Sequence, residues 1–361
     1  MSKLRVGVVF GGRSVEHEVS IASATSIVAA LDPARYEVVL LGVDANGRWR
    51  LAPPGALPER AFGGDEVRLP AVPGEGRLSR VEGGEATAPL DVVFPIVHGT
   101  GGEDGSLQGF LELADVPYVG ASVLGSAIQM DKEVAKRLLA AAGLPVVPWI
   151  TVRSRDFTRN PSGVVKSVLA EMAPPLFVKP ASLGSSVGIS KVKDPRALEP
   201  ALAEAARYDA KLLVERAIDA REIEVGVIDG EPPEASVVGE IVPKREWYDY
   251  ESKYVDEDTE LLVPASIPDD VAARARSLAL EAFRVLEGEG LARADFLLER
   301  TTNALFVSEL NSLPGFTEVS MYPRLWEASG LPYPALLDRL IELAIERHRR
   351  RGGLERTYRR G

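Results

Sequence analysis

The residues with the clearest chemical potential follow an apolar, strand-like run in the segment VKPASLGSSVGIS. Lys179 lies on this run, and the loop after it contains Gly184, Ser185, Ser186 and Gly188. Small residues let backbone N–H groups and hydroxyls approach phosphate oxygens closely, and a lysine adds a point charge. The pattern is not a P-loop, which needs a Gly-Lys-Ser/Thr ending and opens a helix. It indicates a phosphate-binding loop, with a simple turn as the alternative.

A second chemistry-bearing group lies on two strand-like runs, ARADFLLER and ALFVSELNSLPG. Side chains alternate along a strand, so Arg293 and Asp295 share a face, as do Glu309 and Asn311. A turn at residues 301 to 303 would pair the runs as a hairpin and bring all four side chains together. Carboxylate and amide oxygens suit Mg²⁺. We therefore expect a magnesium site here, with an ordinary exposed acidic strand face as the alternative.

Composition restricts the class of protein. The chain has 361 residues, of which 45% are hydrophobic and 26% charged, which is enough for two or three cores. It contains no cysteine, which excludes disulfides and thiolate metal sites. The net charge of -11 argues against general nucleic-acid binding. The arginine-dense stretch over residues 347 to 360 is interpreted as a solvated helix end and frayed tail, with a basic interaction arm as the alternative.

The start of the chain, MSKLRVGVVFGG, is typical of a buried first strand and lacks the long apolar core of a signal peptide. No unbroken apolar stretch reaches the length that spans a bilayer. The sequence therefore predicts a cytoplasmic protein that binds small-molecule substrates and neither nucleic acid nor membrane. A homodimer is compatible with this prediction.

The elements that must position these residues begin with an open α/β domain over residues 1–121. RVGVVF, VSIASATSIVAALD and YEVVLLGVD form a strand, a helix and a strand. PLDVVFPIVHG restores a buried strand, and GSLQGFLELADVPYVG adds a short helix and strand. Residues 51–90 are rich in Pro, Gly and Glu, and we expect a surface insertion with at most short strands.

Two further domains carry the lysine loop and the acidic hairpin. Residues 122–217 start with an amphipathic helix in MDKEVAKRLLAAAGLP, stopped by Gly143 and Pro145, and continue with short antiparallel strands. Residues 218–361 contain the paired strands REIEVGVIDG and PEASVVGEIV, a loop around WYDYESKY, a long helix and the hairpin. The fold class is α/β, with α+β character in the central domain. We expect the chemistry in the clefts between the three domains.

These motifs together resemble the ATP-grasp superfamily and, within it, the D-alanine–D-alanine ligases. The superfamily resemblance rests on the strand lysine with its small-residue loop, on LLVERAI, and on the hairpin ending in E-x-N. The closer resemblance rests on GGRSVEHEVS, HGTGGEDGSLQG, MDK, WYDYESKY and NSLPGFTEVSMYP, in this order between Arg5 and about Leu336. It implies a three-domain ATP-grasp fold. It also implies ATP-dependent ligation of two D-alanines through an acyl phosphate, for peptidoglycan precursor and cell-wall synthesis.

The resemblance implies ATP and two Mg²⁺ ions, with Mn²⁺ as a substitute. The implied ATP residues are Lys132, Lys179, Ser186 and Lys253 for the phosphates, Glu215, Ala217 and Ile218 for the adenine hinge, and Glu222 for the ribose. The implied metal ligands are Asp295, Glu309 and Asn311. Among them, Glu309 would bridge two ions about 3.5–4 Å apart.

The amino-acid site follows from the same resemblance. Its residues are Glu16 for the ammonium of the first D-alanine, Ser185 and Tyr254 as hydrogen-bonding companions, Arg293 and the backbone N–H of Gly315 for the reacting carbonyl, and Ser320 beside Met321 for the carboxylate of the second D-alanine. His98 matches a residue near the first amino acid. The segment WYDYESKYVDEDTE is expected to close as a lid, with an edge strand as the alternative.

Three other functions remain as alternatives. A ligase that makes D-alanyl-D-lactate would share nearly every residue, but it usually replaces the pair Lys253-Tyr254, which is present here. Another carboxylate–amine ligase of the superfamily would keep the ATP residues and lose EHEVS and GFTEVS. A non-catalytic nucleotide-binding regulator would have lost metal ligands, whereas all three are intact.

Overall fold

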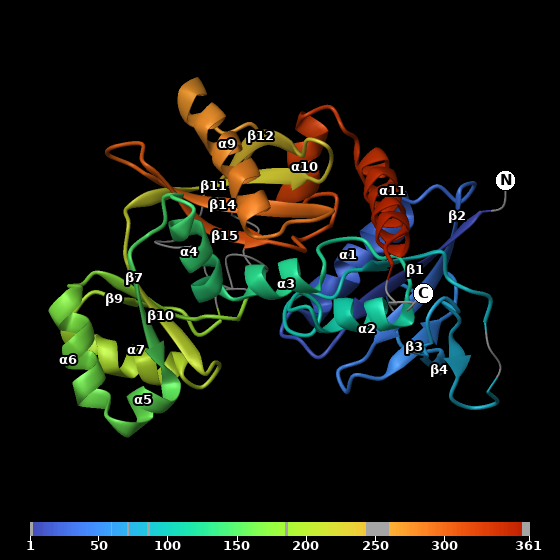
Figure 1. Ribbon diagram of the computed structural model, residues 1–361, viewed down its shortest axis with the longest axis horizontal. Coiled ribbons are helices and arrows are strands. Elements are labelled where there is room, and N and C mark those ends of the chain that lie inside the picture. Colours follow the sequence, from blue (N-terminus) through green and yellow to red (C-terminus); the bar gives the residue numbers. More distant parts are fainter. Residues whose placement is uncertain are drawn as a thin grey trace, which may run out of the picture.

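The fold contains three α/β units, each built around one sheet. The computed structural model describes residues 3–58, 60–70, 72–84, 87–184, 187–242 and 260–355. In Figure 1 the first unit lies at the right, the central unit at the lower left, and the third unit above them. Helices and strands are mixed throughout, which confirms the expected α/β class. Within the described ranges no helix is both long and apolar enough to cross a membrane.

The first unit contains a six-stranded sheet in the order β5-β4-β3-β2-β1-β6. Strand β1 (Leu4–Gly11) pairs in parallel with β2 (Tyr36–Val43) and with β6 (Val92–Pro95). Their largely apolar sequences are typical of parallel strands that are buried on both faces. Because β1 and β6 are parallel, the loops that follow them lie at the same edge of the sheet. Helix α1 (His17–Ala30) starts from the loop after β1.

The segment predicted as a surface insertion, residues 51 to 90, extends this sheet with short strands. Strands β3 (Trp49–Ala52), β4 (Asp65–Arg68) and β5 (Ser79–Arg80) pair antiparallel in succession at one edge. Helix α2 (Ser106–Ala114) then packs against one face of the sheet. The short strands agree with the expectation from the sequence.

Helix α11 (Tyr333–Gly352) comes last in the chain but packs on the first sheet (Figure 1). Its side chains Leu337 and Leu340 are buried in one cluster with Val8 and Phe10 of β1. Helices α1 and α11 therefore cover one face of this sheet, and α2 covers the other. The domain limits at residues 121 and 217 stay a prediction. The structure adds that the last helix, α11, completes the core of the first unit.

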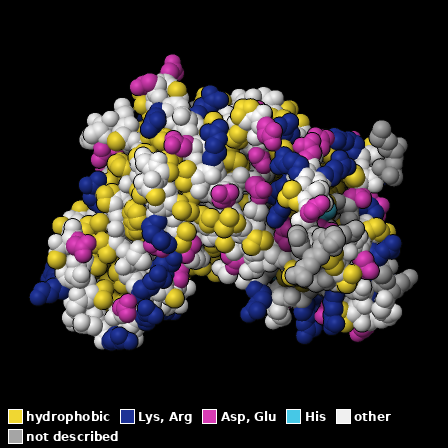
Figure 2. All heavy atoms as spheres, viewed as in Figure 1, with side chains coloured by type: hydrophobic (Ala, Val, Ile, Leu, Met, Phe, Trp, Pro, Cys, Tyr) yellow, Lys and Arg dark blue, Asp and Glu magenta, His cyan; other side chains and the backbone are white. Residues whose placement is uncertain are grey.

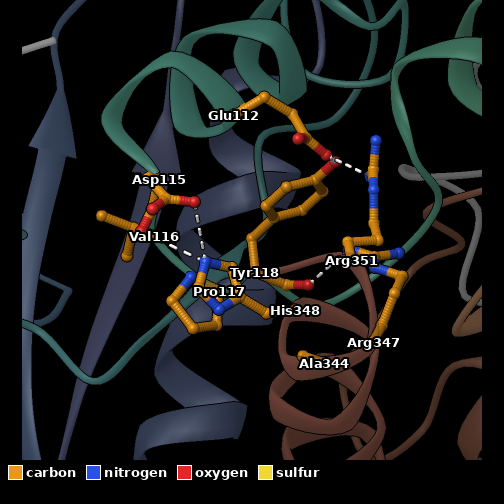
Figure 3. Close-up of a pocket in the computed structure, with 9 residues that line it drawn as sticks. All are labelled: Glu112, Asp115, Val116, Pro117, Tyr118, Ala344, Arg347, His348 and Arg351. Carbon is orange, nitrogen blue, oxygen red and sulfur yellow. Dashed lines mark hydrogen bonds and ion pairs between the residues drawn. The ribbon is translucent and has the colours of Figure 1, made fainter. Parts of the chain in front are cut away.

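The arginine-rich end of α11 is tied to the first unit (Figure 3). Arg347 is only 5% exposed, donates a hydrogen bond of 2.8 Å to the Tyr118 carbonyl, and lies 4.5 Å from the centre of the Tyr118 ring. Beside it, His348 Nε2 lies 3.1 Å from the carboxylate of Asp115. The interpretation of residues 347 to 360 as a solvated end is therefore wrong at Arg347, because buried carbonyl groups require donors.

The central unit is preceded by helix α3 (Val123–Met130) and begins with α4 (Lys132–Ala141). The Asp131 carboxylate caps α4 by accepting two backbone N–H groups at 3.1 Å. Gly143, with φ of 84°, follows the helix in the left-handed conformation that ends many helices. The predicted helix and its stop are confirmed.

The central sheet is antiparallel, in the order β7-β10-β8-β9. Its strands are β7 (Trp149–Arg153), β8 (Leu176–Pro180), β9 (Ser190–Val192) and β10 (Lys211–Arg216). The helices of this unit are α5 (Ser154–Arg159), α6 (Pro161–Glu171) and α7 (Leu198–Ala205), with a 3₁₀ turn at Pro195–Ala197. Buried side chains of α6 and α7 cover one face of the sheet. The alternation of strand side chains places Lys179 and Glu215 together on the other face.

The third sheet is antiparallel, in the order β13-β12-β11-β14-β15. Its strands are β11 (Ala220–Ile228), β12 (Glu234–Val242), β13 (Glu260–Leu262), β14 (Leu291–Glu299) and β15 (Leu305–Asn311). Helix α9 (Asp269–Val285) packs through Ala275, Leu278 and Ala282 on its apolar face. Helix α10 (Met321–Ala328) also packs against this unit. The polar side chains of the hairpin point away from α9.

Candidate active site

The β14–β15 hairpin brings the four predicted polar side chains together. Arg293 pairs with Asn311 in the strand register, and Asp295 pairs with Glu309. The Arg293 guanidinium donates two hydrogen bonds of 2.7 Å to the Asp295 carboxylate, and Asn311 Nδ2 donates one of 2.8 Å. The convergence expected from strand alternation is therefore confirmed. The carboxylates, the amide and the guanidinium form one polar cluster on the sheet face opposite α9.

Glu224 belongs to the same cluster and was missed by the sequence analysis. Its Oε2 atom lies 3.0 Å from Arg293 Nε, and its side chain is 5% exposed. Burial alone would lower the pKa of Arg293, but the carboxylates of Asp295 and Glu224 raise it well above its ordinary value. The sequence did contain a signal for Glu224, because strand alternation in REIEVGV places it on the same face as Glu222.

Lys132 links the hairpin to the predicted phosphate loop. Its ammonium lies 3.2 Å from Glu309 Oε2 and donates a hydrogen bond of 2.9 Å to the Leu183 carbonyl. Its backbone N–H donates to the Ala181 carbonyl, also at 2.9 Å. The lysine thus holds the loop after β8 against the acidic hairpin of the next unit. Ser185 and Ser186, also predicted to act in this loop, lie outside the described residues, as do Lys253 and Tyr254.

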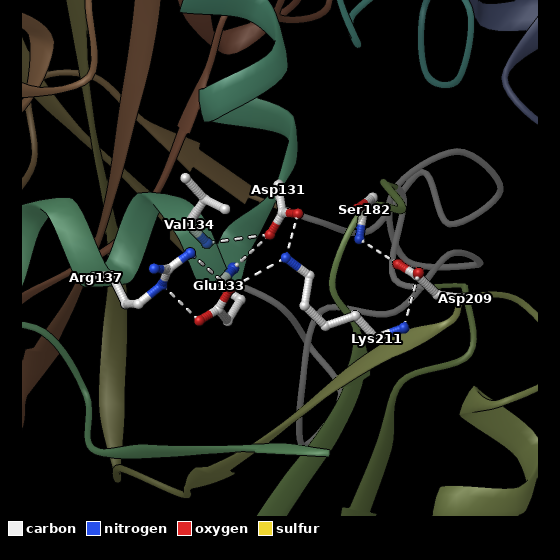
Figure 4. A network of polar contacts seen from close by, with 7 residues as sticks. All are labelled: Asp131, Glu133, Val134, Arg137, Ser182, Asp209 and Lys211. Atoms are coloured by element: carbon white, nitrogen blue, oxygen red, sulfur yellow. Dashed lines mark hydrogen bonds and ion pairs between the residues drawn. The ribbon is translucent and has the colours of Figure 1, made fainter. Parts of the chain in front are cut away.

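A network of polar contacts at the start of this loop joins Ser182 to the beginning of β10 and to α4 (Figure 4). The Asp209 carboxylate accepts the backbone N–H groups of Ser182 and Lys211 at 2.7 Å and 3.1 Å. The Lys211 ammonium pairs with Asp131, which caps α4, and with Glu133 at 3.1 Å. Since Lys132 follows Asp131 directly, the network sets where α4 presents Lys132 to the loop.

Glu215 lies between two lysines and is the most buried carboxylate on this side of the site. Its Oε2 is 2.7 Å from Lys179 Nζ, and its Oε1 is 3.2 Å from Lys136 Nζ. Burial alone would raise the pKa of Glu215, but the ammonium groups of Lys179 and Lys136 lower it to about 2. Burial alone would also lower the pKa of Lys179, but the Glu215 carboxylate raises it above its ordinary value. For Lys136 burial outweighs the effect of Glu215, and the pKa of Lys136 is lowered. Lys136 was not predicted to belong to the site.

This arrangement predicts how acid affects stability through Glu215. Because its folded pKa is about 2, against an ordinary value of 4.5, the stabilising contribution is complete above about pH 4.5 and is lost as the pH falls towards 2. We expect the difference in unfolding free energy between the wild type and Glu215→Gln to shrink over this range. Urea unfolding of both proteins at several pH values measures it. A difference that does not change with pH would contradict the assignment.

The remaining predicted nucleotide residues lie just after β10 and on β11. The backbone N–H of Ala217 donates to the Pro175 carbonyl at 3.0 Å, so Ala217 has only its carbonyl to offer a nucleotide. Ile218 follows it in the segment between β10 and β11, and Glu222 lies on β11 opposite Leu297. Their roles in binding adenine and ribose stay predictions.

Glu16 lies where the first unit meets the loop after β8. It directly precedes α1 and is 8% exposed. A Cβ atom on Gly99 would lie 2.7 Å from Glu16 Oε2, and one on Gly184 would lie 3.2 Å from it. Both loops therefore approach the carboxylate so closely that glycine is needed at Gly99, which also has φ of 76°. A charged group bound at Glu16 would contact both units.

His98 makes buried polar contacts on both sides of its ring, and its predicted place near the first amino acid stays a prediction. Its Nδ1 lies 3.1 Å from the Leu313 carbonyl oxygen, and its Nε2 lies 3.1 Å from Ser23 Oγ. Glu103 Oε1 is 3.5 Å from the same ring, and burial raises the pKa of Glu103 although His98 opposes the shift. The side chain, 3% exposed, joins the first unit to the segment that leads to Gly315.

Gly315 and Ser320 lie together before α10. A Cβ atom on Gly315 would lie 3.2 Å from Ser320 Oγ. That hydroxyl accepts the Thr317 N–H at 3.1 Å and lies 2.7 Å from the Thr317 hydroxyl. Met321, predicted beside the second substrate, is 5% exposed and packs in a small core cluster. Its side chain therefore has a packing role.

The chemistry of the donors fits a divalent cation. Asp295 and Glu309 are directly opposed carboxylates, and Asn311 adds an amide on the same sheet face. Hard oxygen ligands of this kind suit Mg²⁺. Protein cations neutralise both carboxylates in this structure, Arg293 at Asp295 and Lys132 at Glu309. No group of three or more His, Asp or Glu side chains suited to a metal occurs in the described ranges, so the amide and the substrate phosphates would have to complete the coordination.

The face in Figure 2 is hollowed between the central unit at the lower left and the first unit at the lower right. An antiparallel sheet that bears Lys179, joined through Lys132 to an acidic hairpin on the neighbouring sheet, is the arrangement expected of an ATP-grasp protein. Two family models match the chain, the D-ala D-ala ligase N-terminus over residues 5–121 and the D-ala D-ala ligase C-terminus over residues 138–342. The chain belongs to the D-alanine–D-alanine ligase family.

Individual relatives agree with this assignment. A protein named D-alanine--D-alanine ligase A from Chromobacterium violaceum is 49% identical, with 99% of each chain covered. A D-alanine–D-alanine ligase structure from Coxiella burnetii has a TM-score of 0.84 at 39% identity, covering 98% of this chain and 97% of that one. The VanG D-Ala:D-Ser ligase structure from Enterococcus faecalis has a TM-score of 0.85 at 30% identity, covering 95% and 100%. Membership of the family implies use of ATP and metal ions.

Proposed function

We propose that this chain joins two D-alanines into D-alanyl-D-alanine, with conversion of ATP to ADP and phosphate, for peptidoglycan synthesis. The observation that carries the proposal is the cluster in which Lys132 holds the predicted phosphate loop against Glu309 of the acidic hairpin. A carboxylate is a poor acyl donor at neutral pH, so a phosphate leaving group must first be attached to it. The cluster supplies the charges for that transfer.

In the first step, a carboxylate oxygen of the first D-alanine attacks the γ-phosphorus of ATP, and ADP leaves. Lys132 and Lys179 would bind the phosphates and offset their charge, because phosphoryl transfer depends mainly on positioning and charge neutralisation. Asp295, Glu309 and Asn311 would hold two Mg²⁺ ions, or Mn²⁺ in their place, which supply further charge neutralisation when bound. The product is an acyl phosphate.

In the second step, the amine of the second D-alanine attacks the acyl carbon. The oxyanion that develops would be stabilised by the Arg293 guanidinium and the Gly315 N–H. Phosphate then leaves with its bonding electrons, and the proton lost by the amine nitrogen ends on the released phosphate. The carboxylate of this second amino acid would lie at Ser320. Because the reaction needs no nucleophilic side chain, binding and orientation of two substrates are the main tasks of the protein.

We expect Glu16→Gln to raise the KM for the first D-alanine about 10- to 100-fold, because it removes a charged partner of the substrate ammonium. Binding of ATP should change little, since Glu16 lies at the first unit and not at the lysine pair. Steady-state kinetics and calorimetry with ATP measure the two effects. Glu18→Gln, an exposed carboxylate in the first turn of α1, is the control. If Glu16→Gln lowered the affinity for ATP as well as for D-alanine, the assignment of Glu16 to the amino-acid site would be wrong.

The nature of the second substrate needs a direct test, since the fold is shared with a D-Ala:D-Ser ligase. Relatives near 49% identity are named D-alanine--D-alanine ligases, which favours D-alanine. ADP release measured with D-alanine alone, and with D-serine or D-lactate added, separates the alternatives. A chain that prefers either of the added substrates would disprove the proposal.

We also infer a cytoplasmic location. Whether the chain forms a homodimer is decided by a measurement of its mass in solution.

A further inference from the structure

The function above gives no role to Lys136, a lysine on α4 one turn after Lys132. Its side chain is 2% exposed, so it cannot reach a bound nucleotide without a large rearrangement. Its ammonium lies 3.2 Å from Glu215 Oε1, 3.4 Å from the Val147 carbonyl oxygen, and 5.8 Å from the centre of the Trp149 ring. Burying a lysine this deeply is costly, because its charge loses the solvation of water.

Glu215 divides its two oxygens between two lysines. Oε2 pairs with Lys179 at 2.7 Å, and Oε1 pairs with Lys136 at 3.2 Å. Glu215 and Lys136 are 5% and 2% exposed, whereas Lys179 is 16% exposed and is the member nearest to solvent. The three groups together contain two positive charges and one negative charge. The cluster therefore carries a net charge of +1. Lys179 is the member placed to direct that charge to a ligand.

Removal of Lys136 would change this balance. Lys179 and Glu215 alone would form a neutral buried pair, and Lys179 could turn to a phosphate only by leaving Glu215 without a partner. An unpaired buried carboxylate is strongly unfavourable. Lys136 therefore supplies the second partner that Glu215 needs when Lys179 moves its charge to a ligand.

We propose that Lys136 is a positioning residue that keeps Glu215 neutralised and thereby frees the charge of Lys179 for the phosphates of ATP. This inference rests on the proposed function, because it requires that Lys179 contacts phosphate. Lys136 acts through Glu215 and Lys179 and touches no substrate. We therefore expect that replacing Lys136 weakens phosphate binding although this side chain lies behind the site.

The test compares binding of the magnesium complex of AMP-PNP with binding of adenosine, which lacks phosphates. The ratio of the two affinities isolates the contribution of the phosphates, and calorimetry measures it. We expect Lys136→Met to lower this ratio at least about tenfold, which corresponds to about 1.4 kcal/mol. In kinetics the KM for ATP should rise more than kcat falls. Lys166→Met is the matched control, since Lys166 is an exposed lysine on α6 and its loss removes the same charge.

A second variant keeps the test decisive if Lys136→Met folds poorly. Adding Glu215→Gln to Lys136→Met returns the cluster to one net positive charge, and the double variant should recover most of the lost ratio. Lys136→Arg, which keeps the charge, should stay near the wild type. A purely structural role predicts the opposite, with equal losses for adenosine and AMP-PNP and no recovery in the double variant. Either of those results would overturn the inference.

Lys179→Met separates this inference from the proposed function. If Lys179→Met leaves the ratio of affinities unchanged, Lys179 does not bind phosphate. The phosphate contact assigned to Lys179 in the proposed function is then wrong. If Lys179→Met lowers the ratio while Lys136→Met does not, the proposed function stands and only the role of Lys136 is wrong. We expect both variants to lower it, with the larger loss for Lys179→Met.

Discussion

Replacement of Glu309 by Gln is expected to lower kcat by about 10²- to 10³-fold or more while the fold remains intact. Glu309 pairs with Lys132 at 3.2 Å and lies opposite Asp295, so its charge acts on both the predicted phosphate lysine and the predicted metal ligands. A neutral amide keeps the size of the side chain and leaves the cations at this position under-neutralised. ADP release at saturating ATP, D-alanine and Mg²⁺ measures the loss.

The control for this variant is Glu299→Gln at the far end of β14, where the carboxylate accepts a hydrogen bond from Thr302. It removes the same charge from the same hairpin without touching the polar cluster, and its turnover should match the wild type. Circular dichroism and thermal unfolding verify that both variants fold. Near-normal turnover of Glu309→Gln at saturating Mg²⁺ would disprove the assignment of this hairpin to the active site.

Arg293→Met is expected to impair both turnover and stability. The guanidinium is the shared partner of Asp295 and Glu224, so its removal leaves two poorly solvated carboxylates facing each other. Breaking a buried pair in this way costs about 3–5 kcal/mol. If Arg293 lies beside the reacting carbonyl as proposed, loss of this preorganised group should lower kcat by about 10²- to 10³-fold. Urea unfolding and ADP release measure the two losses.

The two losses can be separated with a second substitution. Adding Glu224→Gln to Arg293→Met removes one of the two unneutralised like charges and should recover part of the stability. Turnover should not recover, because the oxyanion still lacks its cation. A double variant that regains turnover along with stability would show that Arg293 only holds the fold together.

Local pattern in the sequence was enough to predict the acidic hairpin. Strand alternation puts Arg293 and Asp295 on one face, and the short turn after them leaves few ways to pair the two strands. The same reasoning gave helix α4 and its stop at Gly143, and the cap at Asp131 that the structure shows also lies within a few residues of the helix. Spacing along the chain determines such features because the interacting groups are close in sequence.

The partners of the buried charges were decided only by tertiary structure. Lys136 was counted as part of an ordinary amphipathic helix, and its pairing with Glu215 depends on how α4 docks against β10. The position of His98 near a substrate stays a prediction, and nothing in the sequence indicated that its ring contacts the Leu313 carbonyl, a partner far along the chain. Arg347 was interpreted as solvated because its sequence neighbours are charged, whereas carbonyls of the first unit bury it.

The physical reason for this division is the range of the interactions. Caps, turns and strand alternation involve neighbours a few residues apart, so the amino-acid sequence by itself determined where the helices and strands of this protein lie and which face carries the hairpin chemistry. A buried charge is stable only beside a partner that also leaves water. For Lys136, Glu224 and Arg347 those partners come from other elements, and only the packing of the three sheets and of α11 decided which groups they would meet.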